Sequence, residues 1–482
     1  MKRLVKRILL ALGLIVLVGL IAGGVYGWMM LRVGSAYSAK ILCSAVFVSG
    51  RPAASVLAED LKHLSFIGTR VDEQNRWVTA SVFGLVRRRA IYREGLGCTL
   101  VNGTTVEALK EQGRLAPKGP APGLADRPWP DGDLLPADPL PPGIDQARLE
   151  KALDEAFSEP NPQLPRRTRA VVVLYQGRLA AERYAPGITQ DTPLLGWSMT
   201  KSVMNALVGV LMGQGKLRPN DRSLLPGWQN EDDPRRAITL GQLLRMESGL
   251  KFDENYDPPS DATTMLFVVP DAGSFAAAKH LAVKPGSRWE YSSGTANIVS
   301  RLVRQTLGSS DADYFAFPRR ALFDRVGMRS AVLEPDPSGT FVGSSYMYAT
   351  ARDWARFGLL YLGNGRWGND QVLPVGWVPY TRLPAKSAPL GQYGAHFWLN
   401  VGEPNNPAKR WMPRLPADLF STAGFEGQYV AIIPSRELVV VRLGQTPKRE
   451  GWNQEDFLVR VLEAFPGPEK AAADAKPESG SR

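Results

Sequence analysis

The chain has 482 residues, of which 44% are apolar and 22% charged, so most of it can fold around a sizeable core. The formal charge is +11, but the 58 lysines and arginines form no dense run, which argues against nucleic acid and favours a solvated surface near anionic lipid. With two cysteines and three widely separated histidines, the sequence predicts no metal site and no cofactor.

The N-terminus predicts a membrane anchor. A basic segment, residues 1–7, precedes an uncharged apolar run from Ile8 to Leu31, which as a helix would span about 36 Å at roughly 1.5 Å per residue. Because basic flanks stay cytoplasmic, we expect a single-pass protein of a bacterial-type inner membrane, with the chain after Arg32 on the periplasmic or extracytoplasmic side. A cleavable signal peptide is the alternative, but the apolar run from Val25 onward continues beyond the small residues that a cleavage site would use.

Two further predictions depend on this topology. The spacing of Gly19, Gly23 and Gly27 would let two such helices touch, so a homodimer is permitted without being required. Cys43 and Cys98 would lie in an oxidising compartment, where a disulfide persists that cytosolic thiols would lose. We therefore expect a Cys43–Cys98 bridge, with two buried free thiols as the alternative.

The rest of the chain divides by composition. A small N-terminal region, residues 32–115, carries no recognisable chemistry. It is followed by a linker at 116–143, whose nine prolines exclude a helix or a central strand. Residues 144–465 form the main domain. The tail at 466–482 is small and charged without an aromatic residue, so we expect disorder there.

The main domain begins and ends with helix and strand signals. Asp145 caps a helix, and residues 170–184 are typical of a hairpin that turns at Gln176-Gly177. Residues 428–443 predict a second hairpin, and a closing helix follows at 456–465. Because the segment between the hairpins is largely helical, we expect an α+β fold. One antiparallel sheet would be built from both ends of the domain and flanked by helices, with a helical subdomain inserted.

The candidate chemistry starts from Ser-x-x-Lys, which places a hydroxyl and an amine on one face of a helix. The pattern occurs twice, at Ser198 with Lys201 and at Ser248 with Lys251. The first precedes the apolar stripe of a buried helix, whose N-terminus can also stabilise an oxyanion. The second precedes Gly249, which is typical of a helix end. We therefore assign the nucleophile to Ser198 and a capping role to Ser248.

A histidine-based triad is the competing arrangement. The sequence contains no Gly-x-Ser-x-Gly turn, and His63, His280 and His396 lie far from any plausible nucleophile in sequence. A Ser-His-Asp triad would therefore depend on contacts between distant segments.

Five motifs occur in an order that resembles the serine β-lactamase-like hydrolases, a family that includes class C β-lactamases, DD-peptidases, esterases and 6-aminohexanoate-dimer hydrolases. Residues 198–201 resemble the first motif, and Trp289-Glu290-Tyr291-Ser292-Ser293 resembles the second, usually Tyr-x-Asn. Residues 423–428 fall where the third motif, Lys-Thr-Gly or His-x-Gly, is expected. Residues 238–250 and 348–358 resemble the family's "LLxMxSGL" and "TARDWARFG" segments. The resemblance covers roughly residues 144–465.

The resemblance implies roles for individual residues. Ser198 would attack a carbonyl, while Lys201 and Tyr291 would share the proton transfer as the general base. The backbone N–H groups of Ser198 and Gln428 would form the oxyanion hole. Tyr256 is a candidate for lining the substrate side, and an ordinary packed tyrosine is the alternative.

Two departures from the family pattern bear on the substrate. Ser293 stands where the second motif usually has an asparagine, which removes an amide that could bind a substrate amide. In the third motif, Phe425-Glu426-Gly427 lacks the usual cation, which normally pairs with a substrate carboxylate. These three residues are the substrate-binding candidates, and an arginine from elsewhere, such as Arg410, is the alternative source of a cation.

The sequence therefore predicts a membrane-anchored serine hydrolase that acts through an acyl-enzyme on a small ester or linear amide. A DD-peptidase or β-lactamase is less favoured because the cation is missing. A non-catalytic binding or sensor protein of the same fold is the other alternative, but it would have no need of Ser198, Lys201 and Tyr291 together.

Overall fold

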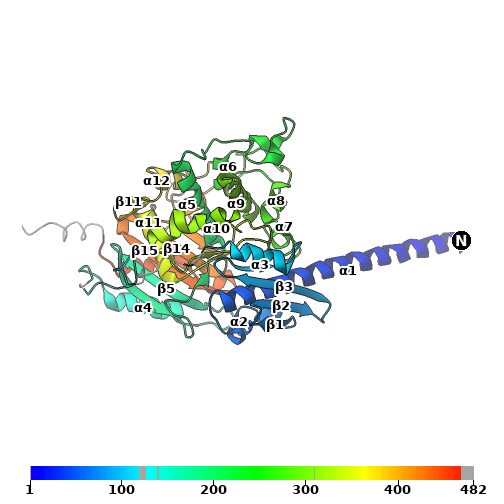
Figure 1. The fold of residues 1–482 in the computed structure, drawn as a ribbon, viewed down its shortest axis with the longest axis horizontal. Coiled ribbons are helices and arrows are strands. Elements are labelled where there is room, and N and C mark those ends of the chain that lie inside the picture. The colour runs from blue at the N-terminus through cyan, green and yellow to red at the C-terminus, as the bar shows by residue number, and fades with distance from the viewer. Residues whose placement is uncertain (1, 118, 120–125, 138–139, 309, 468–482) are drawn as a thin grey trace, which may run out of the picture.

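A six-stranded antiparallel sheet joins the two ends of the main domain in a computed structural model that describes residues 2–117, 119, 126–137, 140–308 and 310–467 (Figure 1). Its strand order is β12-β13-β14-β15-β5-β6. The strands are β5 (Thr168–Tyr175), β6 (Arg178–Tyr184), β12 (Trp398–Leu399), β13 (Phe420–Gly424), β14 (Gln428–Ile433) and β15 (Leu438–Gly444). The last strand pairs with the first, with Val440 opposite Val173, so the predicted sheet built from both ends is confirmed.

Helices cover both faces of this sheet. Along β5, Val171 and Val173 pack on α4 (Gln146–Phe157) and α13 (Gln454–Glu463), whereas Val172 and Leu174 face the opposite core. Successive side chains of a strand point to opposite faces, so a strand buried on both sides is apolar throughout. On the second face, α11 (Ala351–Leu362) packs against β14 and β15.

The inserted part is largely helical, as the sequence predicts. Its helices are α5 (Thr200–Gly213), α6 (Leu240–Leu244), α7 (Asp261–Phe267), α8 (Ala272–Ala277), α9 (Ser293–Leu307), α10 (Asp311–Pro318) and α12 (Trp377–Thr381). A small sheet of order β7-β9-β8 lies between the two parts. Its strands are β7 (Leu194–Leu195), β8 (Val332–Leu333) and β9 (Met347–Ala349), and β10 (Arg366–Trp367) pairs with β11 (Asp370–Gln371).

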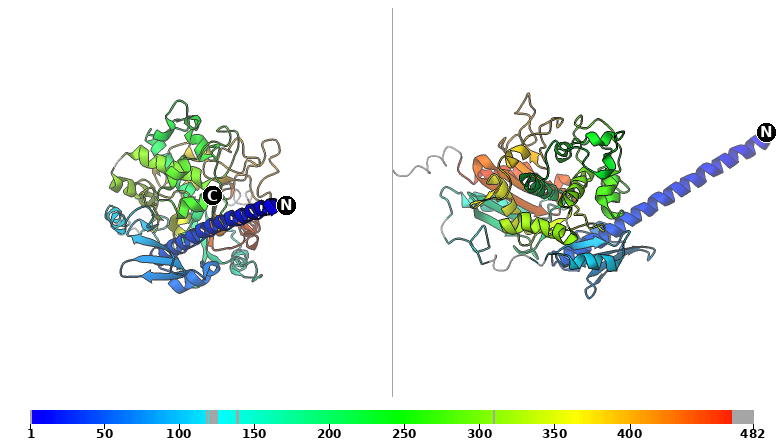
Figure 2. Two further views of the ribbon diagram at one scale, coloured as in Figure 1. Left: turned by 90° about the vertical axis from the view of Figure 1, so that its right-hand side faces the viewer. Right: turned by 45° about the horizontal axis from the view of Figure 1, so that its top comes forward.

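The N-terminal helix α1 (Lys2–Phe47) is continuous from the apolar run into the folded part, and its first half projects as a rod (Figure 2). The predicted boundary at Arg32 therefore falls inside one helix, which is buried from about Val33 onward. Four antiparallel strands pack on the buried half, followed by a short helix. They are β1 (Gly68–Asp72), β2 (Trp77–Val82), β3 (Val86–Arg93), β4 (Gly97–Leu100) and α3 (Val106–Arg114), with α2 (Ala53–Glu59) between α1 and β1. The predicted Cys43–Cys98 disulfide is present and ties α1 to β4.

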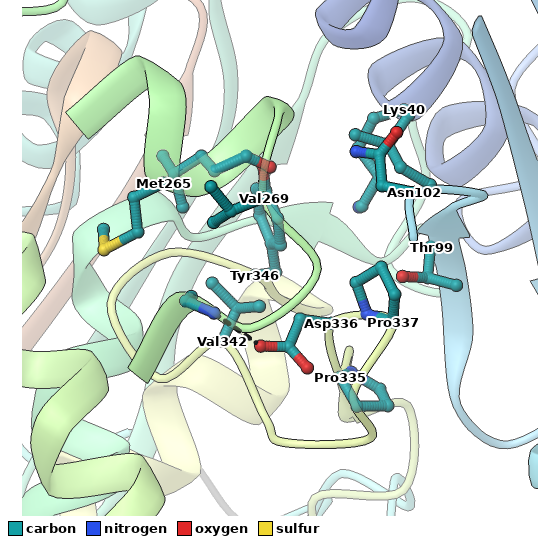
Figure 3. Close-up of a pocket in the computed structure, with 13 residues that line it drawn as sticks. Lys40, Thr99, Asn102, Met265, Val269, Pro335, Asp336, Pro337, Val342 and Tyr346 are labelled. Atoms are coloured by element: carbon teal, nitrogen blue, oxygen red, sulfur yellow. Dashed lines mark hydrogen bonds between the residues drawn. The ribbon is translucent and has the colours of Figure 1, made fainter. Parts of the chain in front are cut away.

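A buried ion pair docks this N-terminal region onto the main domain. Lys40 of α1 contacts Glu334, whose carboxylate also accepts hydrogen bonds from Ser44 Oγ at 2.8 Å and from the backbone N–H of Cys98 at 2.6 Å. A cavity of about 10 Å³ lies beside the pair, lined by Lys40 from one part and Asp336 from the other (Figure 3). A cavity of this size has room for roughly one water molecule. The interface is therefore closely packed rather than a loose linkage.

The described part of the proline-rich segment forms an ordered belt. The Trp129 indole is buried and donates to the carbonyl of Gly177 at 2.9 Å, while Arg356 of α11 lies over its ring at 4.6 Å. The same arginine donates to the carbonyl of Pro130 at 2.8 Å. Arg356 belongs to the "TARDWARFG" segment, and its contacts with Trp129 and Pro130 explain its presence there. The sequence predicts disorder for the C-terminal tail. From residue 468 onward, this tail lies outside the described residues.

Candidate active site

A tight turn presents Ser198 at the start of a buried helix. The chain passes from β7 through Gly196 into a 3₁₀ turn at Trp197–Met199, which continues directly into α5. Trp197 has a φ of 47°, a left-handed conformation that non-glycine residues rarely adopt. A Cβ at Gly196 would lie 2.4 Å from the ring of Trp354, so the helix α11 packs directly beneath the turn. Ser198 remains half-buried, within reach of a ligand from solvent.

Lys201 lies one helical turn further and points back at the serine. Its Nζ lies 3.0 Å from Ser198 Oγ, 3.1 Å from Ser293 Oγ and 3.0 Å from the carbonyl oxygen of Ser344. The side chain is 1% exposed, and this burial lowers the pKa of Lys201 to about 8, although the charge of Glu254 opposes the shift. An amine with that pKa is partly neutral at physiological pH and can accept a proton.

Tyr291 completes the cluster. Its ring centroid is 4.8 Å from Lys201 Nζ. Burial raises the pKa of Tyr291 well above its ordinary value, and a hydrogen bond with Ser198 opposes part of that rise. The preceding residue, Glu290, donates its backbone N–H to the carbonyl of Met246 at 2.9 Å. The "LLxMxSGL" segment therefore holds the second motif in place.

The structure gives Ser293 a use that the sequence did not reveal. Glu254 accepts hydrogen bonds from the backbone N–H of Ser293 at 2.7 Å and from its Oγ at 2.6 Å. The Tyr256 hydroxyl lies 3.1 Å from the same Oγ and donates to Glu254 at 3.0 Å. Ser293 thus links Lys201 to a carboxylate instead of merely lacking an amide. Only the proximity of Glu254 to Tyr256 in sequence hinted at this network.

The third-motif segment flanks the turn that carries Ser198. Phe425 is 52% exposed and stacks on Tyr256, with ring centroids 6.0 Å apart. The Glu426 carboxylate instead accepts from the Trp197 indole at 3.3 Å and from the Gln445 amide at 3.0 Å. Burial raises the pKa of Glu426 above its ordinary value, and the hydrogen bonds from Gln445 and Trp197 oppose part of that rise.

Gln428 begins β14 beside the same turn. Its side-chain amide donates to the carbonyl of Gly444 at 2.6 Å and accepts from the Gly444 N–H at 2.8 Å, so the side chain is engaged by the neighbouring strand β15. A Cβ at Gly424 would lie 2.2 Å from the carbonyl oxygen of Gly196, so the backbones of the strand end and the turn that carries Ser198 are in direct contact. Any contribution of Gln428 to an oxyanion hole therefore comes from its backbone.

A groove of about 980 Å³ lies beside the third motif. Its lining includes Phe425 and Gly427 together with Trp411 and Arg449. An aromatic series leads to it from Tyr291, because Trp398 stacks on Tyr291 at 5.5 Å and contacts Trp411 at 5.9 Å. No sequence motif indicates this aromatic wall of Trp398 and Trp411.

The arginine proposed as a substitute cation lies elsewhere. Arg410 donates to the carbonyls of Pro407 and Pro413 in its own loop, at 3.4 Å each. The cation that does line the groove is Arg449, whose guanidinium lies over the Trp411 ring at 5.5 Å.

The second Ser-x-x-Lys segment makes no such cluster. Ser248 Oγ lies 3.2 Å from Thr295 Oγ1 and accepts the backbone N–H of Leu250 at 3.3 Å, while Lys251 is exposed. Gly249 has a φ of 73°, which ends the helical path between the two side chains.

The histidines do not assemble a triad within the described residues. His396 is buried and its Nδ1 lies 3.0 Å from the backbone oxygen of Lys201, but burial lowers the pKa of His396 to about 3 and keeps it neutral. His63 and His280 are exposed. Across the part of the chain that the structure describes, no group of three or more potential ligands is placed to hold a metal ion.

A model of the β-lactamase family matches residues 149–464, which include all five motifs. The chain belongs to the β-lactamase family. Its members are serine hydrolases, and this chain is an enzyme of that type. A curated relative, the 6-aminohexanoate-dimer hydrolase of Paenarthrobacter ureafaciens, is 24% identical over 352 residues, which cover 66% of this chain and 84% of the relative.

Solved structures of the β-lactamase family share the fold. A Bacillus anthracis protein provisionally named a 6-aminohexanoate-dimer hydrolase has a TM-score of 0.52 at 21% identity, covering 66% of this chain and 83% of that one. A family VIII carboxylesterase has a TM-score of 0.51 at 14% identity, covering 68% and 98%. At these identities the likeness concerns the fold alone. The N-terminal region of the present chain lies outside the family match.

Proposed function

We propose that this protein is a membrane-anchored hydrolase that cleaves neutral esters or linear amides through an acyl-enzyme on Ser198. The observation that carries the proposal is the 3.0 Å contact between Lys201 Nζ and Ser198 Oγ, made by an amine whose burial lowers its pKa to about 8. A serine hydroxyl is a weak nucleophile unless a neighbouring base takes its proton.

The proposed reaction has two halves. The neutral Lys201 amine removes the Ser198 proton as Oγ bonds to the substrate carbonyl carbon, and the backbone N–H groups of Ser198 and Gln428 stabilise the oxyanion. The intermediate collapses as the bond to the leaving group breaks, and Tyr291, protonated because its pKa is raised, passes a proton to that group. Water then attacks the acyl-serine by the reverse route and releases the acid.

The surroundings favour an uncharged substrate. Phe425 occupies the place where family members usually carry the carboxylate-binding cation, and the aromatic wall through Trp398 and Trp411 suits an apolar or linear chain. The curated relative named a 6-aminohexanoate-dimer hydrolase points to a linear amide, and the carboxylesterase neighbour to an ester. Because Glu426 is engaged by Trp197, the missing cation matters more than repulsion from its carboxylate.

The exposed apolar half of α1 supports the membrane location. It is long and apolar enough to cross a bilayer, and the disulfide between Cys43 and Cys98 fits an oxidising compartment beyond it. The basic residues before Ile8 support a catalytic domain on the periplasmic or extracytoplasmic side, because basic flanks stay cytoplasmic.

The test is a comparison of substrates on the full-length protein in detergent. We expect p-nitrophenyl butyrate to be hydrolysed far better than a chromogenic cephalosporin, because a lost charged hydrogen bond costs roughly tenfold to hundredfold in affinity. Phe425→Lys should narrow this gap. Leu383→Lys is the matched control, since Leu383 is 55% exposed and Phe425 52%, and it adds the same charge outside the groove.

Two results would contradict the proposal. Efficient cephalosporin turnover with esters untouched would point to Arg449 as the cation and to a β-lactamase or DD-peptidase. Absence of fluorophosphonate labelling at Ser198 would point to a binding or sensor protein that retained the fold.

A further inference from the structure

The membrane helix contacts the loop that carries a residue of the candidate active site. Tyr26, in the apolar half of α1, donates its hydroxyl to the carbonyl of Pro258 at 3.2 Å. Pro258 follows Tyr256 by two residues, a separation of at most about 7 Å. Tyr256 in turn hydrogen-bonds Ser293, the partner of Lys201. A chain of direct contacts thus leads from the membrane segment to the catalytic lysine.

The β2–β3 turn is a second surface that reaches the level of Tyr26 on α1, from the other side of the helix. The disulfide sets Cys98, opposite Tyr92 on β3, beside residue 43 of α1. Ile67 lies 3.1 Å from the Cβ position of Gly34, so the start of β1 lies nine residues nearer the N-terminus of α1. The strand β3 therefore lies along α1 with its start nearer the N-terminus of α1 than its end. The β2–β3 hairpin points in the direction in which α1 projects (Figure 1).

That turn is apolar and exposed. Phe83 and Leu85 are 87% and 78% exposed, in a tight turn closed by the Leu85 N–H on the carbonyl of Val82 at 3.0 Å. Figures 1 and 2 show α1 leaving the folded part between this hairpin and α7, the helix that directly follows the Pro258 loop. Two apolar side chains at a hairpin tip beside an apolar helix that is long enough to span a membrane suit insertion at the bilayer surface.

The residues at this level match a membrane–water boundary. Tyr26 and Trp28 stand near the end of the apolar run and are about half exposed, as aromatic residues in an interfacial belt are. Arg32 follows one turn later on α1 and lies within electrostatic range of Arg88 on β3, next to the exposed Arg87. Basic side chains just beyond an apolar tip are complementary to anionic headgroups.

We propose that the entrance of the active site lies at the headgroup level of the bilayer, and that the substrate is an amphipathic ester or amide whose apolar chain resides in the membrane. The inference rests on the hydrolase function proposed above. The stacked and exposed pair of Tyr256 and Phe425 forms the rim nearest the Pro258 loop and receives the apolar chain as it leaves the lipid. The scissile carbonyl then reaches Ser198 without crossing bulk water.

The test compares a bilayer-resident and a water-soluble substrate on the full-length protein in vesicles of phosphatidylcholine with phosphatidylglycerol. The substrates are p-nitrophenyl palmitate in the bilayer and p-nitrophenyl butyrate in water. We expect the double variant Phe83→Asp/Leu85→Asp to lose at least about tenfold of palmitate turnover while butyrate turnover is unchanged, because it removes the apolar contact that seats the entrance on the lipid. Aspartate tolerates the φ of 50° at position 83, so the turn should still form.

Val375→Asp is the matched control, because Val375 is also 87% exposed but lies beside α12, far from α1 (Figure 1). It should change neither rate. Equal losses on both substrates in the Phe83/Leu85 variant, or no loss on palmitate, would overturn the proposal.

A second measurement does not use activity. An environment-sensitive dye on Phe83→Cys should be quenched by spin-labelled lipid, whereas the same dye on Val375→Cys should not. Equal quenching at both positions would overturn the membrane placement. Quenching at position 83 alone, combined with absent Ser198 labelling and absent butyrate turnover, would overturn the hydrolase proposal and the substrate class but leave the surface contact standing.

Discussion

The two Ser-x-x-Lys segments have the same spacing and opposite outcomes. At the first, the helical path from Ser198 brings Lys201 Nζ to 3.0 Å from the serine hydroxyl. At the second, Gly249 turns the chain into a left-handed conformation and Lys251 points into solvent. Four residues of sequence do not determine whether a serine and a lysine meet; the backbone between them does.

Burial separates the two lysines as strongly as geometry does. Lys201 is enclosed by the side chain of Ser293 and the carbonyl of Ser344, and its burial lowers its pKa to about 8. Lys251 is exposed and has no such enclosure. An amine becomes a useful base near neutral pH only when its charged form is made unfavourable.

Replacing each serine by alanine should give the largest difference in labelling and turnover between the two segments. Ser198→Ala should abolish fluorophosphonate labelling and lower p-nitrophenyl butyrate turnover by at least about a thousandfold, because the nucleophile is gone. Ser248→Ala should label normally. Full labelling of Ser198→Ala would show that another residue carries the acyl group.

Removing the lysines should give the next largest difference. Lys201→Ala should lower turnover by on the order of a hundredfold or more, the usual contribution of a positioned base. Lys251→Ala provides the matched control and should be unchanged. Similar turnover rates for Lys201→Ala and Lys251→Ala would show that a different group is the general base. His396 is then the residue to test next.

The pH profile should report the same amine. Turnover should rise roughly tenfold per pH unit well below the Lys201 pKa of about 8 and level off above it, because only the deprotonated amine accepts the serine proton. Tyr291→Phe should lower the plateau and leave the midpoint in place, since the pKa of Tyr291 is raised out of this range. A profile falling above pH 7 would contradict the assignment of Lys201 as the base.

The smallest effect concerns stability at the second segment. Ser248→Ala removes the hydrogen bond with Thr295 and the acceptor for the Leu250 N–H, and should cost about 1 kcal/mol of unfolding free energy. Denaturant unfolding with unchanged turnover is the expected result. A large loss of turnover at unchanged stability would mean that Ser248 has a catalytic role after all.

The sheet and its flanking helices could be predicted because they are encoded locally. The apolar runs of β5 and β15 and the helix cap at Asp145 are visible in short windows of sequence, and the structure places them as expected. The N-terminal region was harder. The apolar run stops near Leu31, but the helix continues to Phe47 because the strands of that region cover its next turns.

The candidate active site also could be predicted only in part. Ser198, Lys201 and Tyr291 could be proposed from motifs, whereas Glu254 and the carbonyl of Ser344 could not, because they lie 39 residues from Ser293 and 143 residues from Lys201 in the chain. The contacts of Ser293 could not be predicted either. Comparison with the family's second motif indicated a missing amide, and the fold in addition brings a lysine and a carboxylate to the Ser293 hydroxyl.

By itself the sequence determined the long apolar helix, the disulfide partners, the sheet and the family, because apolar length, cysteine number and ordered motifs are properties of short segments. Tertiary structure decided which serine meets its lysine, how far that lysine's pKa falls, and that the Tyr256 loop lies against Tyr26 of α1. The physical reason is that burial and contact are properties of the space between segments. Those distances are fixed only when the whole chain packs.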